Sequence, residues 1–347
     1  MNSKTIGILT VILSISLSLM ILSCANPDID YQARGDEYRG EGSLPQAIAD
    51  YTKAIQMDSQ DAEAYYKRGA AYLQQRENDK AINDFTKAIE LDPGYIDAYN
   101  DRGIAYAREG YPDQAIVDFD KAIELDPAYA DAYNNRGLVY RNRGDYDQAI
   151  ADFTIAIQLD LNHRLAYRNR AVAYAAIQQH EQAIDDFTRA ILIEPNNVFL
   201  YNERGIEYGK IEDYVNAIAD FNKAIAINPT NTDAYNNRGI VYSRAGDYDR
   251  ALVDFSDALR MDPEYALAYC NRGIAYLAMN ECDKSLTDLN RALEIRPSYA
   301  EAYYFRGLAN VCLNHTTEAI ADFDQCIEIS KDPDMVANAQ LQLEAIR

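Results

Sequence analysis

The chain has 347 residues and a formal net charge of −22, and 48% of its residues are hydrophobic. This length suits either two ordinary globular domains or one elongated array of repeats, with enough apolar side chains for a packed core. The negative charge argues against sequence-independent binding to nucleic acid, because phosphates require a basic surface.

The N-terminal segment differs from the rest of the chain. Lys4 precedes an apolar stretch over residues 6–22, and the small Ser23 stands before Cys24. A positive start, an apolar run and a small residue at a cleavage site are typical of an export signal. The apolar run is short for a membrane-spanning helix. We therefore expect residues 1–23 to be a signal peptide and residues 24–27 to be a short tether.

The tetrapeptide Ile-Leu-Ser-Cys that ends at Cys24 resembles a bacterial lipoprotein box. The resemblance implies cleavage before Cys24 and acylation of its thiol, as with palmitate, and of the new N-terminus. Leu22 departs from the pattern, which usually has a smaller residue there. Several acyl chains hold a domain durably on a membrane. The expected location is therefore a bacterial membrane, facing the periplasm or the cell surface. Two alternatives stay open: an uncleaved signal anchor facing the cytosol, and an ordinary signal peptide with a chance cysteine.

From Asp28 onward the sequence repeats with a period of 34 residues and no insertion or deletion. Each block has Tyr at position 4, and nearly every block has Gly at 8, Ala at 20, an aromatic at 24 and Ala at 27. Positions 4, 8 and 11 share one helical face, as do 20, 24 and 27, so each block predicts an antiparallel helix pair. The nine blocks are 28–61, 62–95, 96–129, 130–163, 164–197, 198–231, 232–265, 266–299 and 300–333.

Residues at the expected helix ends support this division. Glycines at block position 15 can end the first helix in a left-handed conformation, and aspartates that follow can cap the second helix. Pro112 suits the first turn of a helix, and prolines at position 32 end the second helix in six blocks. These residues are Gly110, Gly144 and Gly246, followed by Asp145, Asp213 and Asp247.

The block pattern is similar to the signature of the tetratricopeptide repeat family, which has an aromatic at 4, Gly at 8, Tyr at 11, Ala at 20, Phe at 24, Ala at 27 and Pro at 32. The resemblance covers residues 28–333. It implies an all-α solenoid of nine helix-turn-helix repeats that forms a right-handed superhelix. Residues 334–347 predict one more helix, a cap that turns Val336, Ala339, Leu343 and Ile346 toward the last repeat.

Two charged positions depart from that signature. Position 7, usually Leu, is Arg in every block, and position 23 is Asp in every block. Because the two recur even in the end blocks, we assign them to the scaffold and expect ion pairs within or between neighbouring repeats. The arginines are Arg34, Arg68, Arg102, Arg136, Arg170, Arg204, Arg238, Arg272 and Arg306, and the aspartates include Asp50, Asp118, Asp254 and Asp322.

The resemblance implies that the first helices line a concave groove in which peptides or partner helices bind, with positions 2, 5, 6, 9, 12 and 13 facing the ligand. Side-chain amides donate and accept hydrogen bonds, so a ladder of them can hold an extended peptide backbone. The alternative is that these amides recur only because the block was duplicated. The candidate groove residues are Asn100, Asn134, Asn135, Arg141, Arg168, Asn169, Asn202, Asn236, Asn237, Arg244 and Asn271.

The charge at the six ligand-facing positions indicates what kind of partner the groove can bind. The six positions carry seven basic and eight acidic residues across the array, so the groove is nearly neutral and the acidic excess lies elsewhere. We expect proteins or peptides of mixed or acidic charge as partners. The last block is apolar at Tyr304, Phe305, Leu308 and Val311, which predicts either a self-association surface or burial under the terminal helix.

Catalytic patterns do not emerge from the sequence. His163, His180 and His315 lie far apart, and the sequence has no phosphate-binding glycine loop or nucleophile elbow. We expect no enzyme activity, no metal and no cofactor. Four further cysteines fall in the last two blocks, and antiparallel packing could bring Cys282 near Cys312; whether Cys270, Cys282, Cys312 and Cys326 form disulfides stays open.

Together these features predict a membrane-anchored protein-interaction scaffold. The groove would bind peptides or partner proteins in cell-envelope assembly, by analogy with tetratricopeptide lipoproteins of outer-membrane and pilus assembly. A second hypothesis is a glycan-handling subunit of polysaccharide export or cell-wall remodelling, in which Tyr and Asn side chains contact sugars.

Overall fold

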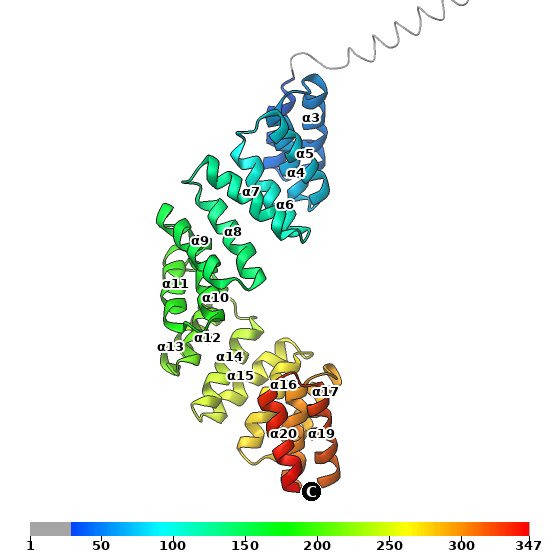
Figure 1. Ribbon diagram of the computed structural model, residues 1–347. Helices are drawn as coiled ribbons and strands as arrows, with labels where there is room; N and C mark the ends of the chain where they lie inside the picture. Colours follow the sequence, from blue (N-terminus) through cyan, green and yellow to red (C-terminus); the bar gives the residue numbers. More distant parts are fainter. Residues whose placement is uncertain (1–28, 347) are drawn as a thin grey trace, which may run out of the picture. The chain divides into compact units, whose positions relative to one another are not determined.

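The computed structural model describes residues 29–346, so the expected signal peptide and Cys24 lie outside the described residues. Those residues form nineteen α-helices and contain no strand (Figure 1). The expected all-α repeat fold is confirmed. The chain divides into two compact units, residues 29–159 and 160–346, which are described separately. The superhelix concerns both units together and stays a prediction.

Each expected block contains one helix pair. The first unit consists of α2 (Tyr31–Gly40), α3 (Leu44–Met57), α4 (Ala62–Gln74), α5 (Asn78–Leu91), α6 (Ile96–Arg108), α7 (Pro112–Leu125), α8 (Ala130–Arg143) and α9 (Tyr146–Leu159). The second unit consists of α10 (Arg164–Ala176), α11 (His180–Ile193), α12 (Val198–Lys210), α13 (Tyr214–Ile227), α14 (Thr232–Arg244), α15 (Tyr248–Met261), α16 (Ala266–Ala278), α17 (Cys282–Ile295), α18 (Ala300–Cys312), α19 (Thr316–Ile329) and α20 (Pro333–Ile346). Among residues 29–346, no helix is long and apolar enough to cross a membrane.

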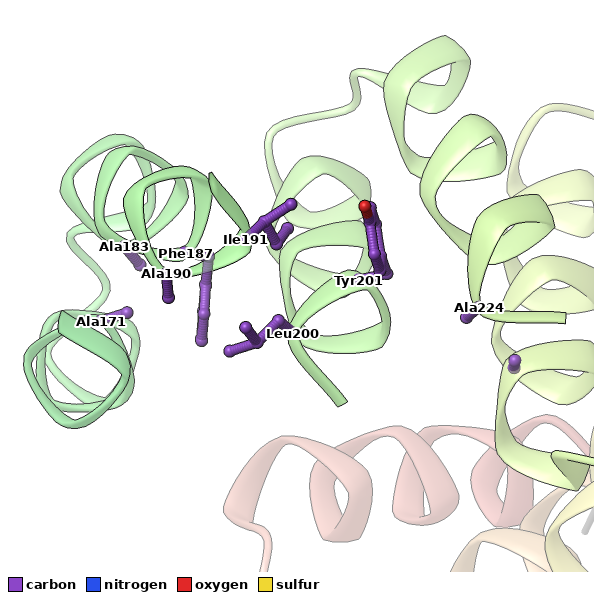
Figure 2. Close-up of a cluster of buried hydrophobic side chains, with 9 residues drawn as sticks. Ala171, Ala183, Phe187, Ala190, Ile191, Leu200, Tyr201 and Ala224 are labelled. Atoms are coloured by element: carbon purple, nitrogen blue, oxygen red, sulfur yellow. The ribbon is translucent and has the colours of Figure 1, made fainter. Parts of the chain in front are cut away.

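The two helices of a repeat pack through the glycine at position 8 and the aromatic ring at position 24. A Cβ added to Gly137 would lie 2.8 Å from Cε1 of Phe153, closer than van der Waals contact allows. The fifth repeat has Ala171 at this position, and Figure 2 shows Phe187 of α11 beside it, with Ala183 and Ala190 on the same face. Leu200 of α12 joins the same cluster. The apolar face of the fifth repeat is therefore buried by its own partner helix and by the next repeat.

A left-handed residue joins the two helices in every repeat. At position 15, Gly42, Gly110, Gly144 and Gly246 have φ between 77° and 88°. The other five repeats place a residue with a side chain there at φ near 62°: Arg76, Gln178, Glu212, Asn280 and Asn314. The 34-residue scaffold therefore imposes this conformation even on residues that do not favour it.

Replacing Gln178 by glycine should raise the free energy of unfolding by about 1 kcal/mol, because a Cβ in the left-handed region costs about that much. Urea denaturation followed by circular dichroism measures the change. Gln182→Gly, at an exposed helical position of α11, is the matched control and should lower stability by about 1 kcal/mol. Equal losses in the two variants would contradict the argument.

Three of the expected helix-terminal residues act as predicted. The side chains of Asp213 and Asp247 accept hydrogen bonds from the backbone N–H of Asn216 and Arg250, and Pro112 is the first residue of α7. These bonds satisfy N–H groups that have no partner within the helix. For Asp145 the structure gives a backbone bond from Ala149 to its carbonyl, so its side-chain cap stays a prediction.

The C-terminal helix α20 covers the last repeat as predicted. Ala339 and Leu343 are buried in a cluster with Phe323 of α19, and Ile346 packs against it. Tyr304, Leu308 and Val311 of α18 are partly buried in the same cluster, and Phe305 packs in the cluster of the preceding repeat. The sequence left two alternatives for these apolar residues, a self-association surface or burial under the terminal helix. The structure shows burial, so the apolar surface that suggested self-association is largely covered.

A disulfide links the last two repeats. Cys282 at the start of α17 and Cys312 at the end of α18 are bonded, with their Cα atoms 6.3 Å apart. Cys270 and Cys326 are buried free thiols, and Cys326 takes the core position of the alanine in other repeats. Burial raises the pKa of both thiols, so the reactive thiolate form is disfavoured.

Candidate functional site

The first helices of successive repeats lie against one another within each unit. In the first unit α4 contacts α6 and α6 contacts α8, and in the second unit α12, α14, α16 and α18 form a similar row. Within residues 29–346, the positions expected to face a ligand lie on the first helices, α2 and α10 included, apart from Ile29 just before α2. We call the surface they form the first-helix face of each unit.

The asparagines join these helices to each other. In the first unit, Nδ2 of Asn135 donates a hydrogen bond to Oδ1 of Asn100 over 3.0 Å. In the second unit, Asn237 donates to Asn202 over 3.2 Å, and Asn271 donates to Asn236 over 2.9 Å. Each bond runs from position 6 of one repeat to position 5 of the repeat before it. These amides therefore connect neighbouring repeats, while the binding of a peptide by them stays a prediction.

Burial divides the candidate asparagines into an inner and an outer part. The position-5 side chains of Asn100, Asn134 and Asn236 are at most 4% exposed, and Asn169 at position 6 is also buried. Asn135, Asn237 and Asn271 are half-buried, as is Asn202. A buried amide whose bonds are made within the protein supports the scaffold more than it contacts a ligand. The partly exposed amides are the ones available to a peptide.

The three basic candidates behave differently from one another. The guanidinium of Arg168 lies 4.2 Å from the ring centroid of Phe199, a cation–π contact that occupies one face of the group. Arg141 is half-buried, and Arg244 is exposed near the end of α14.

A pocket of about 470 Å³ opens on the first-helix face of the first unit. Its walls come from three consecutive first helices, at block positions 5, 6, 9, 12 and 13. The lining residues are Asp36, Arg39, Gly40, Tyr66, Ala70, Leu73, Gln74 and Asp101. None of these was among the candidate groove residues, although all stand at positions expected to face a ligand. The sequence did contain a signal for this pocket. Several other repeats have asparagine at positions 5 and 6, whereas Tyr66 stands at position 5 of the second repeat and Asp101 at position 6 of the third.

The carboxylate of Asp101 in this pocket is held by neutral donors. Tyr66 donates its hydroxyl hydrogen to Oδ2 over 3.0 Å, and Asn100 donates to Oδ1 over 3.1 Å. Burial raises the pKa of Asp101, and the nearby charge of Asp97 raises it further. Asp36, in contrast, forms an ion pair with Lys67 over 2.7 Å. Asp101 is therefore a partly desolvated acid whose two hydrogen-bond donors, Tyr66 and Asn100, are both neutral.

Replacing Asp101 by asparagine should raise the free energy of unfolding at neutral pH, because the folded state no longer holds a desolvated carboxylate. A carboxyl whose pKa is higher in the folded than in the unfolded state gives stability that increases as the pH falls through the folded-state pKa. The wild type should show this increase on mild acidification, and the variant should show less of it. Urea denaturation at a series of pH values measures both; identical pH profiles would contradict the assignment.

The other histidine, cysteine and acidic side chains are further candidates for metal ligands or for isolated pairs. Within residues 29–346, no group of three histidine, cysteine or acidic residues is placed to hold a metal ion. His180 lies 2.7 Å from Glu207, which is buried and also accepts a hydrogen bond from Lys210. The buried acid is thus compensated by two neighbours, as a structural acid would be.

Models of the tetratricopeptide repeat match most of the described chain. One matches residues 62–95, 130–163, 165–197 and 198–231; others match 221–253 and 300–333, and a further TPR repeat model matches 35–76, 113–142, 242–280 and 275–311. The chain belongs to the tetratricopeptide repeat family. Tetratricopeptide repeats mediate binding between proteins, so the fold is that of an interaction scaffold. No curated protein matches this chain.

Three solved structures share the tetratricopeptide fold. A tetratricopeptide repeat protein from Parabacteroides merdae is 19% identical with a TM-score of 0.62, covering 72% of this chain and 98% of that one. Cut9 in the hetero-tetramer Cut9-Hcn1 is 17% identical with a TM-score of 0.56, covering 91% and 75%. PilF of Pseudomonas aeruginosa is 22% identical with a TM-score of 0.53, covering 60% and 94%. At these identities the likeness shows the fold alone.

The arginine at position 7, which departs from the tetratricopeptide signature, forms ion pairs as predicted. In all nine repeats it pairs with the position-23 aspartate of the same repeat, at N–O distances of 2.5–2.8 Å. The aspartates are only 2–6% exposed. In the first repeat the hydrogen bonds from Arg34 lower the pKa of Asp50. Bidentate ion pairs of this kind fix the angle between the two helices of a repeat.

The same arginine also reaches the repeat before it. Arg204, for example, donates to Oγ1 of Thr188 over 2.9 Å while it pairs with Asp220. In seven repeats the acceptor stands at position 25 of the preceding repeat; besides Thr188 these acceptors are Thr52, Thr86, Asp120, Asn222, Ser256 and Asn290. The guanidinium also lies over the position-4 tyrosine of its own repeat. Arginine at position 7 thus joins helices within and between repeats.

Proposed function

We propose that this tetratricopeptide protein is a membrane-anchored scaffold whose first-helix face binds extended peptide segments of partner proteins in the cell envelope. We propose further that a basic residue of the peptide enters the pocket around Asp101. The observation that carries this proposal is the pocket itself. It lies at the positions expected to face a ligand, and it holds a desolvated carboxylate whose neighbours are mainly neutral donors.

A lysine or arginine side chain of the peptide would bring a cation to the Asp101 carboxylate, whose hydrogen-bond donors Tyr66 and Asn100 are neutral. A partly buried carboxylate gains more from a cation that arrives with its partner than an exposed one does, because water screens the interaction less. Arg39 on the pocket wall can meet a carbonyl or carboxylate of the same peptide. The ligand in this proposal is a mixed-charge peptide, one of the two kinds that the sequence suggested.

The binding test uses three fluorescent peptides of alanine and serine that differ at one position, which is lysine, glutamate or alanine. Fluorescence anisotropy with the full-length protein should give about tenfold tighter binding of the lysine peptide, a difference of about 1.4 kcal/mol. Asp101→Asn should remove this preference. Glu124→Gln, an exposed acid on α7, changes the net charge equally and should leave it intact. Equal affinities for all three peptides would overturn the proposal, and tighter binding of a saccharide would favour the glycan hypothesis.

Two observations support an exported, anchored protein. The N-terminal segment resembles a lipoprotein signal ending at Cys24. The Cys282–Cys312 disulfide is of a kind that persists mainly in oxidising compartments. Mass spectrometry of the mature N-terminus, for the wild type and Cys24→Ala, tests the proposal. We expect a cleaved, acylated Cys24 in the wild type; an intact Met1 in both would refute the anchor.

A further inference from the structure

The last repeat lacks an aromatic ring that the other eight repeats contain. Position 11 is tyrosine in those eight: Tyr38, Tyr72, Tyr106, Tyr140, Tyr174, Tyr208, Tyr242 and Tyr276. In the last repeat it is Asn310. The change removes a large side chain from a place where the scaffold is otherwise repeated closely.

The missing ring has defined surroundings in the other repeats. The guanidinium of Arg102 lies 5.7 Å from the ring of Tyr99 and 5.9 Å from the ring of Tyr106. The position-7 arginine is thus close to two rings, at positions 4 and 11, and the same holds in the fifth and sixth repeats. In the last repeat Tyr303 supplies the first ring, at 5.2 Å from Arg306, and position 11 has no ring to supply.

A pocket lies at this place. Its volume is about 380 Å³, and Arg306, Asn310 and Asp322 form part of its wall at positions 7, 11 and 23. Asn310 donates a hydrogen bond to Oδ2 of Asp322 over 2.9 Å, so its short side chain is held against the ion pair. Leu286 and Ala321 add apolar surface. The pocket thus combines a cationic group, a small apolar wall and room for an aromatic side chain.

The charge at the rim is also reversed. At position 19, three other repeats place a cation over the tyrosine ring: Lys80 over Tyr72 at 5.3 Å, Arg250 over Tyr242 at 4.7 Å and Lys284 over Tyr276 at 5.3 Å. The last repeat has Glu318 at this position, and Glu318 lines the pocket with His315. A ligand ring placed here would therefore find a carboxylate where those repeats provide a positive charge.

We propose that this pocket binds an aromatic side chain that carries a neighbouring positive charge, such as a tyrosine beside a lysine in a partner protein. The ring replaces the missing tyrosine against Arg306, where the face of a guanidinium attracts aromatic rings. The cation meets Glu318 at the rim. The site lies on α17, α18 and α19 and shares no residue with the pocket around Asp101. A negative result at one site would therefore leave the proposal for the other unaffected.

Two small probes separate the ring from the charge. Tyramine has a phenol ring and an ammonium group, and 3-(4-hydroxyphenyl)propionate has the same ring with a carboxylate. Nuclear magnetic resonance titration of the full-length protein should show saturable tyramine binding and severalfold weaker binding of the propionate. No saturable binding of tyramine, or equal binding of the two probes, would overturn the proposal.

Variants then locate the site. Asn310→Tyr restores the residue of the other repeats, fills the pocket and should abolish tyramine binding. Ala321→Met fills it from α19 and provides a second test if the first variant folds poorly. Glu318→Lys should reverse the preference between the probes, whereas Glu328→Lys makes the same charge change at an exposed residue of α19 and should not. Unchanged binding in Asn310→Tyr and Ala321→Met would show that tyramine binds elsewhere and would refute the proposal.

Discussion

Replacing Asp186 by lysine should lower the free energy of unfolding by about 3–5 kcal/mol. Asp186 is 5% exposed and accepts hydrogen bonds from Nε and Nη2 of Arg170 over 2.7 and 2.8 Å. The substitution removes the acid that this guanidinium binds within its repeat and places a second positive charge beside it. Removing one partner of a buried pair costs far more than an exposed pair contributes, because the remaining charge stays desolvated.

The neighbouring residue of α11 provides the matched control. Asp185 is exposed, so Asp185→Lys makes the same charge change one residue away and should alter stability by less than about 0.5 kcal/mol. Urea denaturation followed by circular dichroism measures both variants. Similar losses in the two would show that net charge, rather than the buried pair, is responsible.

Replacing Phe187 by alanine should also lower the free energy of unfolding by about 3–5 kcal/mol. Phe187 is 1% exposed and packs between Ala171 of α10 and Leu200 of α12 (Figure 2). Removing the ring leaves a cavity shared by two repeats. The backbone cannot close it easily, because both walls are helices fixed by their own contacts. The same denaturation experiment measures this loss.

Leucine at the same position is the control for volume. The eighth repeat already has Leu289 here, fully buried against Gly273. Phe187→Leu should therefore cost distinctly less than Phe187→Ala, since most of the apolar volume is kept. A leucine variant as unstable as the alanine variant would mean that the ring has a role beyond filling space.

Recurring residues made the fold predictable. A repeated pattern reports helix pairing directly, because the same glycine, alanine and aromatic side chains meet in every repeat. The pairing of Arg170 with Asp186 followed from recurrence as well, although sequence did not decide between pairs within and between repeats. The left-handed residue between the two helices was predictable where it is glycine. At Gln178 the only indication is the 34-residue period, which places this residue at the position of those glycines.

The candidate site was harder to predict because it depends on burial across several helices. Asn100 and Asn236 stand at positions expected to face a ligand, yet the adjoining first helix covers them. The pocket around Asp101 requires side chains from α2, α4 and α6 together, which no single block contains. The pocket at Asn310 had a sequence signal, one asparagine against eight tyrosines, but its meaning depended on what surrounds the missing ring.

In seven repeats the position-7 arginine is bonded to the preceding repeat, so these bonds share one direction along the chain. The acceptor for Arg204, Thr188, belongs to a repeat made earlier, and the other bonds from these arginines to a preceding repeat run the same way. A repeat that emerges from a ribosome or an export channel therefore finds its docking partner already synthesised. Chains fold from their N-terminal part during synthesis. Once its own arginine–aspartate pair is complete, each new helix pair can thus add to a finished template.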